Sequence, residues 1–274
     1  MAAKTDLDTA SAFATSWNTL PAGSVYTTEQ FEDWLSPIRR EDAEGRSILE
    51  LGCGNGSLLL HCIRWHPSRL VGVDLGASVL SARQNLAETG AEGWEIIQAD
   101  LTAFESGGFD VVYCIGVLHH LQDPQAGFDA VVRNTKPGGR FHCWVYAREG
   151  NTLVVLLVDP LRKVASKLHW WFTKYFIASP LAAIFYLYAK AVRLLRRVPG
   201  VAHLPLYAYS LWIAAREYAF FRHVAFDQLV TPATVYLSKT TIQSWLAAHP
   251  RVNQEQSYVI MRNGNSWKFG GVVD

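Results

Sequence analysis

The segment SILELGCGNGSLLLHCIRW, residues 47–65, decides the fold of this chain. An apolar run at 47–51 ends at the glycines of LGCGNG, and an apolar helical pattern follows over 56–65. Glycines at such a junction let the backbone turn sharply out of a strand and approach a ligand closely. The segment therefore predicts a buried strand, a ligand-binding turn and a helix in direct succession.

Strand and helix patterns alternate from this segment to residue 147. Further strand patterns cover 70–74, 94–100, 109–115 and 140–147, with helical patterns at 77–90 and 128–139. A helix at 238–249 and strands at 257–261 and 266–273 follow near the end of the sequence. Helical stretches between strands indicate parallel pairing, because parallel neighbours need long crossovers. The sequence predicts an α/β fold with a doubly wound, mostly parallel seven-stranded sheet.

Interruptions of this alternation divide the chain into four predicted parts. They are an N-terminal helical extension or lid at 1–45, a core at 46–149, a helical insertion at 150–237, and the last helix and final hairpin at 238–274. A capped amphipathic turn at 27–35, stopped by Pro37, marks the extension as helical.

Composition and charge exclude several classes of protein. Half of the 274 residues are hydrophobic and only 18% are charged, so the chain can bury a core and is not disordered. The net charge of +1 argues against a dedicated nucleic-acid binder. The four cysteines are widely spaced without a zinc pattern, and the N-terminus has no apolar signal segment. These features indicate a reduced, metal-free, cytoplasmic protein.

The glycine turn differs from a dinucleotide fingerprint. That fingerprint needs a third glycine at position 57, where this chain has Ser57, and the spacing here is G-x-G-x-G. The carboxylate of Glu50 next to the turn would also repel a pyrophosphate. A ligand with an ammonium or sulfonium group fits this acidic turn better, which disfavours a dehydrogenase.

Two more carboxylates follow neighbouring strands. Asp74 ends the second strand, where a side chain can accept both hydroxyls of a ribose. Asp100 ends the third strand, in a position to accept from an adenine amino group, with Leu101 beside the ring. Because the carboxyl ends of parallel strands share one edge, the three acids predict a single nucleoside-binding crevice.

The motifs ILELGCGNGSLL, VGVD, QADL, FDVVYCIGVLHHL and KPGGRF resemble, in this order and spacing, the class I S-adenosylmethionine (SAM)-dependent methyltransferases. The resemblance covers about 47–147 and implies a Rossmann-like fold, SAM as cofactor and a transferring methyl group over 114–119. It implies that the glycines wrap the methionine part, that Glu50 orders the turn or meets the amino group, and that Asp74 and Asp100 hold ribose and adenine. The implied cofactor-binding residues are Glu50, Gly52, Cys53, Gly54, Asn55, Gly56, Asp74, Leu75, Asp100, Leu101, Cys114 and His119.

Segments 16–38, 226–232 and 263–271 are similar to a bacterial subgroup of small-molecule enzymes in this family. In that subgroup the N-terminal extension folds over the SAM pocket. The similarity implies that Tyr26 and Gln30 are lid contacts.

The candidate catalytic residues follow the fourth and fifth strands. They are His119, His120, Tyr146 and Arg148. Adjacent residues cannot both face one pocket from a regular helix, so we expect at most one histidine to act as a base. Arg148 is placed to bind an anionic acceptor or to form a salt bridge. The fourth strand lacks the Asn/Asp-Pro-Pro-aromatic box that holds planar amino nitrogens, which counts against bases and protein amides as acceptors.

The insertion carries eight Lys/Arg and one acid over 151–200, a net charge of +7, between apolar and aromatic runs. Its longest run, 175–189, is broken by Ser179-Pro180 and would span only about 22 Å as a helix, so the sequence predicts no membrane crossing. The insertion is predicted to serve as an aromatic lid, a surface for peripheral contact with an anionic inner membrane face, or a dimer face. The chain is accordingly a monomer or a homodimer.

The first acceptor predicted is a small thiol or sulfide, because a thiolate needs a closed, dry pocket and little protein base. The alternative is O- or C-methylation of a lipophilic phenol, quinone precursor or lipid at a membrane surface, with a histidine as base. A SAM-binding regulatory module without turnover is the remaining class. The glycine turn with all three acids argues against it.

Overall fold

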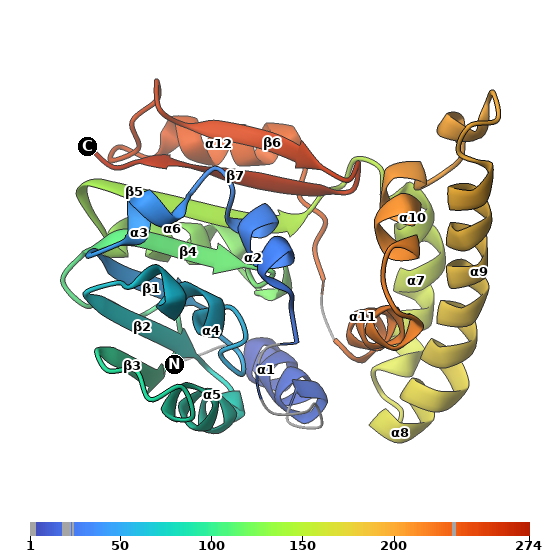
Figure 1. Cartoon of the computed structure of the whole chain (residues 1–274), viewed down its shortest axis with the longest axis horizontal. Coiled ribbons are helices and arrows are strands. Elements are labelled where there is room, and N and C mark those ends of the chain that lie inside the picture. The colour runs from blue at the N-terminus through green and yellow to red at the C-terminus, as the bar shows by residue number, and fades with distance from the viewer. Residues whose placement is uncertain (1–3, 18–22, 24, 232–233) are drawn as a thin grey trace. The chain divides into compact units, whose positions relative to one another are not determined.

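The computed structural model describes residues 4–17, 23, 25–231 and 234–274 (Figure 1). They form two units. The first comprises Met1–Val145, Ala233–Ile260 and Trp267–Asp274, and the second comprises Tyr146–Pro232 and Met261–Ser266.

A seven-stranded sheet in the order β3-β2-β1-β4-β5-β7-β6 forms the centre of the first unit (Figure 1). The strands are β1 (Ser47–Leu51), β2 (Arg69–Asp74), β3 (Trp94–Gln98), β4 (Phe109–Ile115), β5 (Thr135–Tyr146), β6 (Tyr258–Arg262) and β7 (Ser266–Val272). The pairings β1–β2, β1–β4, β2–β3 and β4–β5 are parallel. The strand order reverses between β1 and β4, and such a reversal opens a crevice at the carboxyl edge of a sheet. The predicted doubly wound, mostly parallel fold is confirmed.

Alternating side chains of β5 face two helical layers. Phe141 packs against Phe128 of α6 (Pro124–Asn134), and that ring in turn stacks on Trp245 of α12 (Lys239–Ala248). On the opposite face His142 Nε2 lies 2.7 Å from the carbonyl oxygen of Trp34 in α2 (Thr28–Leu35). The helices α4 (Leu59–Cys62) and α5 (Ser78–Ala87) follow β1 and β2, and a 3-10 turn (Ile63–Trp65) extends α4.

Some element boundaries differ from the predictions. Helix α6 begins at Pro124 rather than 128, because the Asp123 side chain caps it by accepting from the Gln125 and Ala126 amides. The helix ends at Asn134, and residues 135–139 begin β5 instead of ending the helix. The helix predicted at 56–65 starts only at Leu59, because the glycine turn extends into it.

Three helices precede the sheet: α1 (Lys4–Trp17), α2 and α3 (Arg40–Ala43). A reciprocal cap starts α2, since the Thr27 hydroxyl accepts from the Gln30 amide and the Gln30 side chain accepts from the Thr27 amide. The amphipathic pattern of this segment buries Phe31, Trp34 and Leu35.

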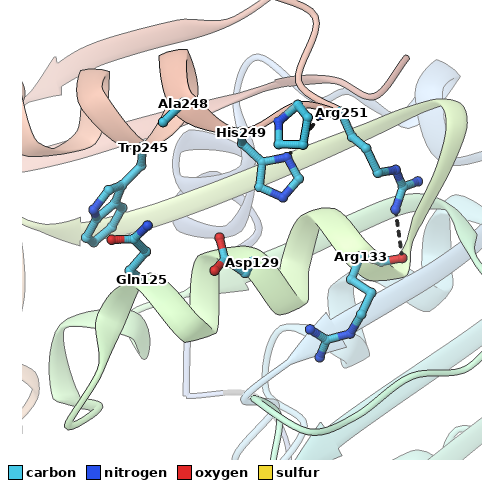
Figure 2. Close-up of a pocket in the computed structure, with 8 residues that line it drawn as sticks. Gln125, Asp129, Arg133, Trp245, Ala248, His249 and Arg251 are labelled. Carbon is cyan, nitrogen blue, oxygen red and sulfur yellow. Dashed lines mark hydrogen bonds between the residues drawn. The ribbon is translucent and has the colours of Figure 1, made fainter.

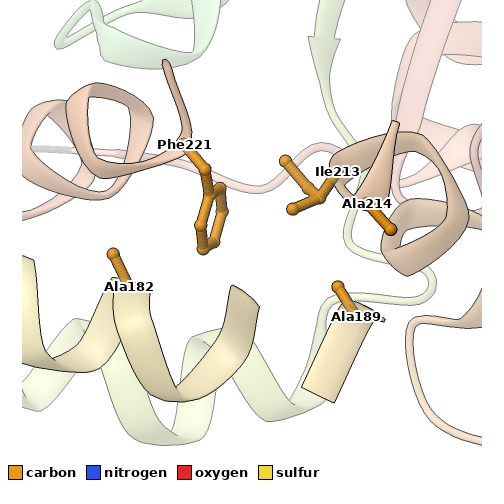
Figure 3. Close-up of a cluster of buried hydrophobic side chains, with 5 residues drawn as sticks. All are labelled: Ala182, Ala189, Ile213, Ala214 and Phe221. Carbon is orange, nitrogen blue, oxygen red and sulfur yellow. The ribbon is translucent and has the colours of Figure 1, made fainter. Parts of the chain in front are cut away.

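The second unit is helical. It contains α7 (Thr152–Ala165), α8 (Trp170–Phe172), a π-helical segment (Thr173–Ala178), α9 (Ser179–Leu195), a 3-10 turn (Val201–His203), α10 (Tyr207–Ala214) and α11 (Tyr218–Val230). Its core is the cluster Ala182, Ala189, Ile213, Ala214 and Phe221, which joins α9 to α10 and α11 (Figure 3). The helix predicted at 206–224 is therefore two helices.

The prediction of a break at Ser179-Pro180 is wrong. Residues Trp170–Leu195 form one helix of 26 residues, because Pro180 follows the π-helical segment at a position where the missing amide interrupts little. By length and composition this helix is long and apolar enough to cross a membrane, and 22% of its most apolar window is buried. The expected length of about 22 Å covered only residues 175–189, so the prediction that this segment is too short to cross a membrane is wrong.

Candidate active site

The glycine turn leaves β1 in a conformation that requires glycine. Gly52, Gly54 and Gly56 have φ angles of +83°, +53° and +79°. A Cβ at Gly52 would lie 2.4 Å from Cγ2 of Val117, so the turn is in tight contact with the segment after β4. A Cβ at Gly54 would meet nothing within 4 Å. The turn is thus closed on the side of Gly52 and open above Gly54, as a cradle for a ligand requires.

Asn55 forms hydrogen bonds within the glycine turn and to α5. Its Oδ1 accepts from the Ser57 hydroxyl at 2.6 Å and the Ser57 amide at 3.2 Å, and its carbonyl accepts from Asn85 Nδ2 of α5. Asn55 and Cys53 are both buried. Their side chains therefore shape the turn, and contacts of Cys53 and Asn55 with the cofactor stay predictions.

Asp74 connects the end of β2 to the glycine turn. Its Oδ2 accepts from the Gly54 amide at 2.9 Å, and its Oδ1 accepts from the Gly76 amide at 2.8 Å and the Ser78 hydroxyl at 3.3 Å. Burial raises the pKa of this carboxyl, although the hydrogen bonds favour its charged form. Asp74 thus lies beside Gly54 of the glycine turn, and its contact with a ribose stays a prediction.

Asp100 and its neighbour lie after β3. The Asp100 carboxylate accepts from the Thr102 amide at 2.9 Å and the Thr102 hydroxyl at 2.7 Å, which fixes the turn. Leu101 is buried and Leu75, after β2, is half-buried. These residues border the carboxyl edge of the sheet, and their contacts with an adenine ring stay predictions.

Glu50 is a buried residue of β1. Its residue is only 2% exposed, and Oε2 accepts from the Tyr113 hydroxyl at 3.2 Å. Burial raises the pKa of Glu50 to about 8. The hydrogen bond from Tyr113 acts to lower this pKa, and the nearby Asp74 carboxylate acts to raise it further. Near neutral pH this carboxyl holds its proton in part, so a cation at the turn would favour its charged form.

We expect Glu50→Gln to stabilise the ligand-free protein at high pH. Since the pKa is raised in the folded state, the unfolded chain holds fewer protons between pH 4.5 and about 8, and stability falls as pH rises through this window. The substitution removes that slope, and we expect a gain of about 2 to 4 kcal/mol at pH 8 relative to pH 5. Urea unfolding at both pH values measures it. The exposed Glu92→Gln serves as control, and equal slopes in wild type and Glu50→Gln would contradict the assignment.

The histidine pair follows β4 in a 3-10 turn, Leu118–His120. The two imidazole centroids lie 4.1 Å apart, and the expectation that at most one of the histidines acts as a base stays a prediction. His119 is completely buried, with Trp144 edge-on at 6.1 Å, and its backbone carbonyl accepts from the Val235 amide. His120 Nδ1 lies 3.1 Å from the Thr234 hydroxyl.

Aromatic rings from distant parts of the chain surround this turn. Phe13 of α1 contacts His120 edge-on at 5.0 Å. Trp34 of α2 lies 5.8 Å from Trp144, and Tyr26 meets Trp34 edge-on at 4.6 Å. Phe13, Trp34, Trp144 and Thr234 were not among the site residues predicted from the sequence. Only Trp144 had a local signal, since it lies two residues before Tyr146 on the same face of a strand.

Helix α1 reaches across the carboxyl edge of the sheet. Asp6 accepts from the Gln122 amide at 2.8 Å beyond β4, and a Cβ at Gly76, beyond β2, would lie 3.0 Å from the carbonyl oxygen of Ala10. Phe13, three residues after Ala10 in α1, contacts His120. This helix therefore covers the region between the cradle and the histidines.

The two predicted lid contacts lie in the segment after α1. The Tyr26 carbonyl oxygen lies 2.8 Å from Nε2 of His61 in α4, which fixes this segment beside the helix that follows the glycine turn. Gln30 is buried, and its Nε2 has no hydrogen-bond partner among the described residues. A buried amide in this position is suited to a ligand contact, and both roles stay predictions.

Three other candidates are placed less favourably. The Cys114 side chain is completely buried, in register with Cys143 of β5, so only its backbone can approach a ligand. Tyr146 and Arg148 belong to the second unit, and Arg148 is exposed. Their catalytic roles stay predictions.

A groove of about 480 Å³ lies elsewhere, between α6 and α12 (Figure 2). It is lined by Gln125, Asp129, Arg133, Trp245, Ala248, His249, Pro250 and Arg251, none of which was a candidate. The guanidinium of Arg251 donates to the carbonyls of Arg133 and Thr135, so it connects the segment after α12 to the end of α6 and the start of β5. We assign the groove to packing between these helices.

Residues 49–141 match the model of a methyltransferase domain family. Over 121 residues the chain is 36% identical to a ubiquinone biosynthesis O-methyltransferase of Thiobacillus denitrificans, covering 41% of this chain and 50% of that protein. It is 33% identical over 108 residues to an uncharacterised protein of Synechococcus sp., covering 38% of this chain and 26% of that protein. The chain thus spans half or less of the length of these relatives.

Two solved structures resemble the whole chain in fold. Magnesium protoporphyrin IX methyltransferase from Synechocystis PCC 6803, with bound S-adenosylhomocysteine, has a TM-score of 0.52 at 15% identity and covers 90% of this chain and 82% of its own. An O-methyltransferase family protein from Burkholderia thailandensis has a TM-score of 0.51 at 15% identity, with 90% and 56% covered. At this identity the likeness shows the fold alone. Residues 49–141 thus match a methyltransferase domain, and the chain has the Rossmann-like fold of methyltransferases.

Proposed function

We propose that this chain transfers the methyl group of SAM to a hydroxyl oxygen of a small, lipophilic acceptor. The observation that carries the proposal is the histidine pair among aromatic rings at the carboxyl end of β4, next to the glycine cradle. An apolar surrounding selects an apolar acceptor, and an imidazole supplies the base that a hydroxyl needs. The matched O-methyltransferases favour oxygen over sulfur.

The residues of the cradle fit SAM. The open space above Gly54 would take the methionine part, and the Asp74 carboxylate beside it would accept from ribose hydroxyls. SAM carries its own electrophilic methyl on a sulfonium, so the chain needs only to align the acceptor and remove a proton. The carboxylates of Glu50 and Asp74 also favour a cationic ligand over a pyrophosphate.

His120 is the base in this proposal. Its Nδ1 is oriented by Thr234, and its Nε2 is the nitrogen that we assign to the proton of the acceptor hydroxyl. With SAM bound, the acceptor oxygen would form a bond to the methyl carbon as the bond from that carbon to the sulfonium sulfur breaks and S-adenosylhomocysteine leaves, and the hydroxyl proton would pass to the imidazole of His120. His119 has no exposed surface, and its role is to pack the turn between His120 and Trp144.

We expect purified chain with SAM to methylate phenols or hydroquinones with apolar substituents, and His120→Gln to lower kcat on them by about 10²- to 10⁴-fold at pH 7. The loss should shrink at pH 9 to 10, where more of the phenol is ionised. S-adenosylhomocysteine release and product mass measure both. His119→Gln is the matched comparison, and we expect it to lower thermal stability more than kcat.

Sulfide and methanethiol form a second arm of the same assay. Methylation of these thiols alone, unaffected by His120→Gln, would contradict the proposal and support the predicted small-thiol acceptor. SAM binding without release from any acceptor would favour the regulatory module.

A further inference from the structure

The outer face of the long helix Trp170–Leu195 is apolar. The side of α9 that carries Ala182 and Ala189 is buried in the core of the second unit (Figure 3). Many of its exposed side chains are also apolar: Phe172, Phe176, Leu181, Ile184, Leu187 and Leu194. The exposed cations of this helix, Lys190 and Arg193, donate to the Ala214 carbonyl in the unit. Ile184, Leu187 and Leu194 are 67%, 69% and 84% exposed. A helix that buries one apolar face and exposes a second apolar face is typical of one whose outer face is covered by protein or lipid.

A second exposed apolar stripe precedes this helix on α7. Leu153, Leu156, Leu157 and Val164 recur at helical spacing and are 44%, 64%, 70% and 59% exposed. The opposite side of α7 is held inside the unit, because buried Arg162 bonds Asp159 and the Gln228 carbonyl of α11. Both helices thus keep one face in the unit and present an apolar face outward.

Exposed cations flank the long helix at both ends. Lys163 and Lys167 lie before Trp170, and Arg196 and Arg197 lie after Leu195. The acid of this segment, Asp159, is paired with Arg162. An apolar helix face with Lys and Arg beside it matches an anionic lipid surface, which takes apolar side chains at the acyl boundary and attracts basic ones. A second copy of the chain would bring the same cations against one another.

We propose that the second unit docks on an anionic phospholipid bilayer through the outer faces of α7 and of the helix Trp170–Leu195, with the helices lying in the interface. A crossing by the helix would require separating α9 from Ile213, Ala214 and Phe221, or drawing α10 and α11 into the bilayer together with Arg222 and Asp227 of α11. Interfacial docking leaves this core intact. The proposal goes beyond methyl transfer and holds whichever acceptor is used.

Vesicle co-sedimentation of the full chain tests the proposal. We expect binding to vesicles of phosphatidylcholine with 30% phosphatidylglycerol to be at least ten-fold tighter than to phosphatidylcholine alone, and to weaken in 0.5 M NaCl. Ile184→Glu with Leu187→Glu should lower this binding at least ten-fold. Leu80→Glu is the matched control, because Leu80 is a similarly exposed leucine (64%) of the first unit. Arg196→Glu with Arg197→Glu should remove the preference for anionic vesicles and leaves the apolar face unchanged.

Several outcomes would overturn the proposal. These are no binding to either vesicle, equal binding by wild type and the Ile184/Leu187 variant, and equal loss in Leu80→Glu. Binding that resists both high salt and alkaline carbonate would indicate a crossing helix instead. Self-association that the Ile184/Leu187 variant abolishes, without vesicle binding, would assign the face to a second copy. None of these measurements needs an acceptor, so they fail or succeed separately from the methyltransferase assay.

Discussion

Gly52→Ala is expected to abolish measurable SAM binding and to destabilise the protein by about 2 to 5 kcal/mol. A left-handed φ of +83° costs an alanine about 1 to 2 kcal/mol, and the added Cβ would lie 2.4 Å from Val117 Cγ2. Relieving this overlap requires the turn to separate from the segment that leads to the histidines. Isothermal titration with SAM and thermal unfolding measure the two effects. Adding Val117→Ala should recover part of the stability.

Gly54→Ala is the matched comparison, and we expect it to lower stability less than Gly52→Ala does while still weakening SAM binding. Its φ of +53° costs alanine a similar strain, but its Cβ would enter open space, so we expect a stability loss of only about 1 to 2 kcal/mol. The same Cβ would stand in the proposed cradle and lower SAM affinity at least ten-fold. Wild-type affinity in Gly54→Ala would show that SAM binds elsewhere.

Asp74→Ala is expected to weaken SAM binding about 100-fold. The substitution removes the proposed ribose acceptor and leaves the Gly54 and Gly76 amides without their hydrogen-bond acceptor, so the cradle loosens as well. Asp74→Asn keeps the shape and one acceptor oxygen, and we expect about a ten-fold loss. Titration of SAM and of S-adenosylhomocysteine against each variant measures both.

Asp110→Asn is the control for a lost carboxylate. Asp110 lies near the start of β4, at the opposite end of the strand from the histidines, where it pairs with Lys136 and Arg46. We expect it to lower stability and to leave SAM affinity unchanged. If Asp74→Ala bound SAM as tightly as wild type, the ribose assignment would be wrong.

The cofactor half of this protein could be predicted from its sequence because its signals are local. Apolar runs of strand length, the glycines at 52–56 and the carboxylates at 74 and 100 lie within a few residues of the strand ends that position them. Parallel pairing then brings these ends to one edge whatever the rest of the chain does. The family resemblance rests on the same local segments.

Tertiary structure alone decided the acceptor side and the insertion. Phe13, Trp34, His120 and Trp144 come together from separate elements, and no periodic pattern within an element indicates which partner a ring will meet. The buried Glu50 carboxyl accepts a hydrogen bond from Tyr113, 63 residues away in the sequence. The Asn55 carbonyl likewise accepts from Asn85 of α5, 30 residues away. Hydropathy identified the insertion as apolar. Which face of Trp170–Leu195 is buried and which is exposed followed only from its packing, because burial depends on long-range contacts that a single sequence does not record.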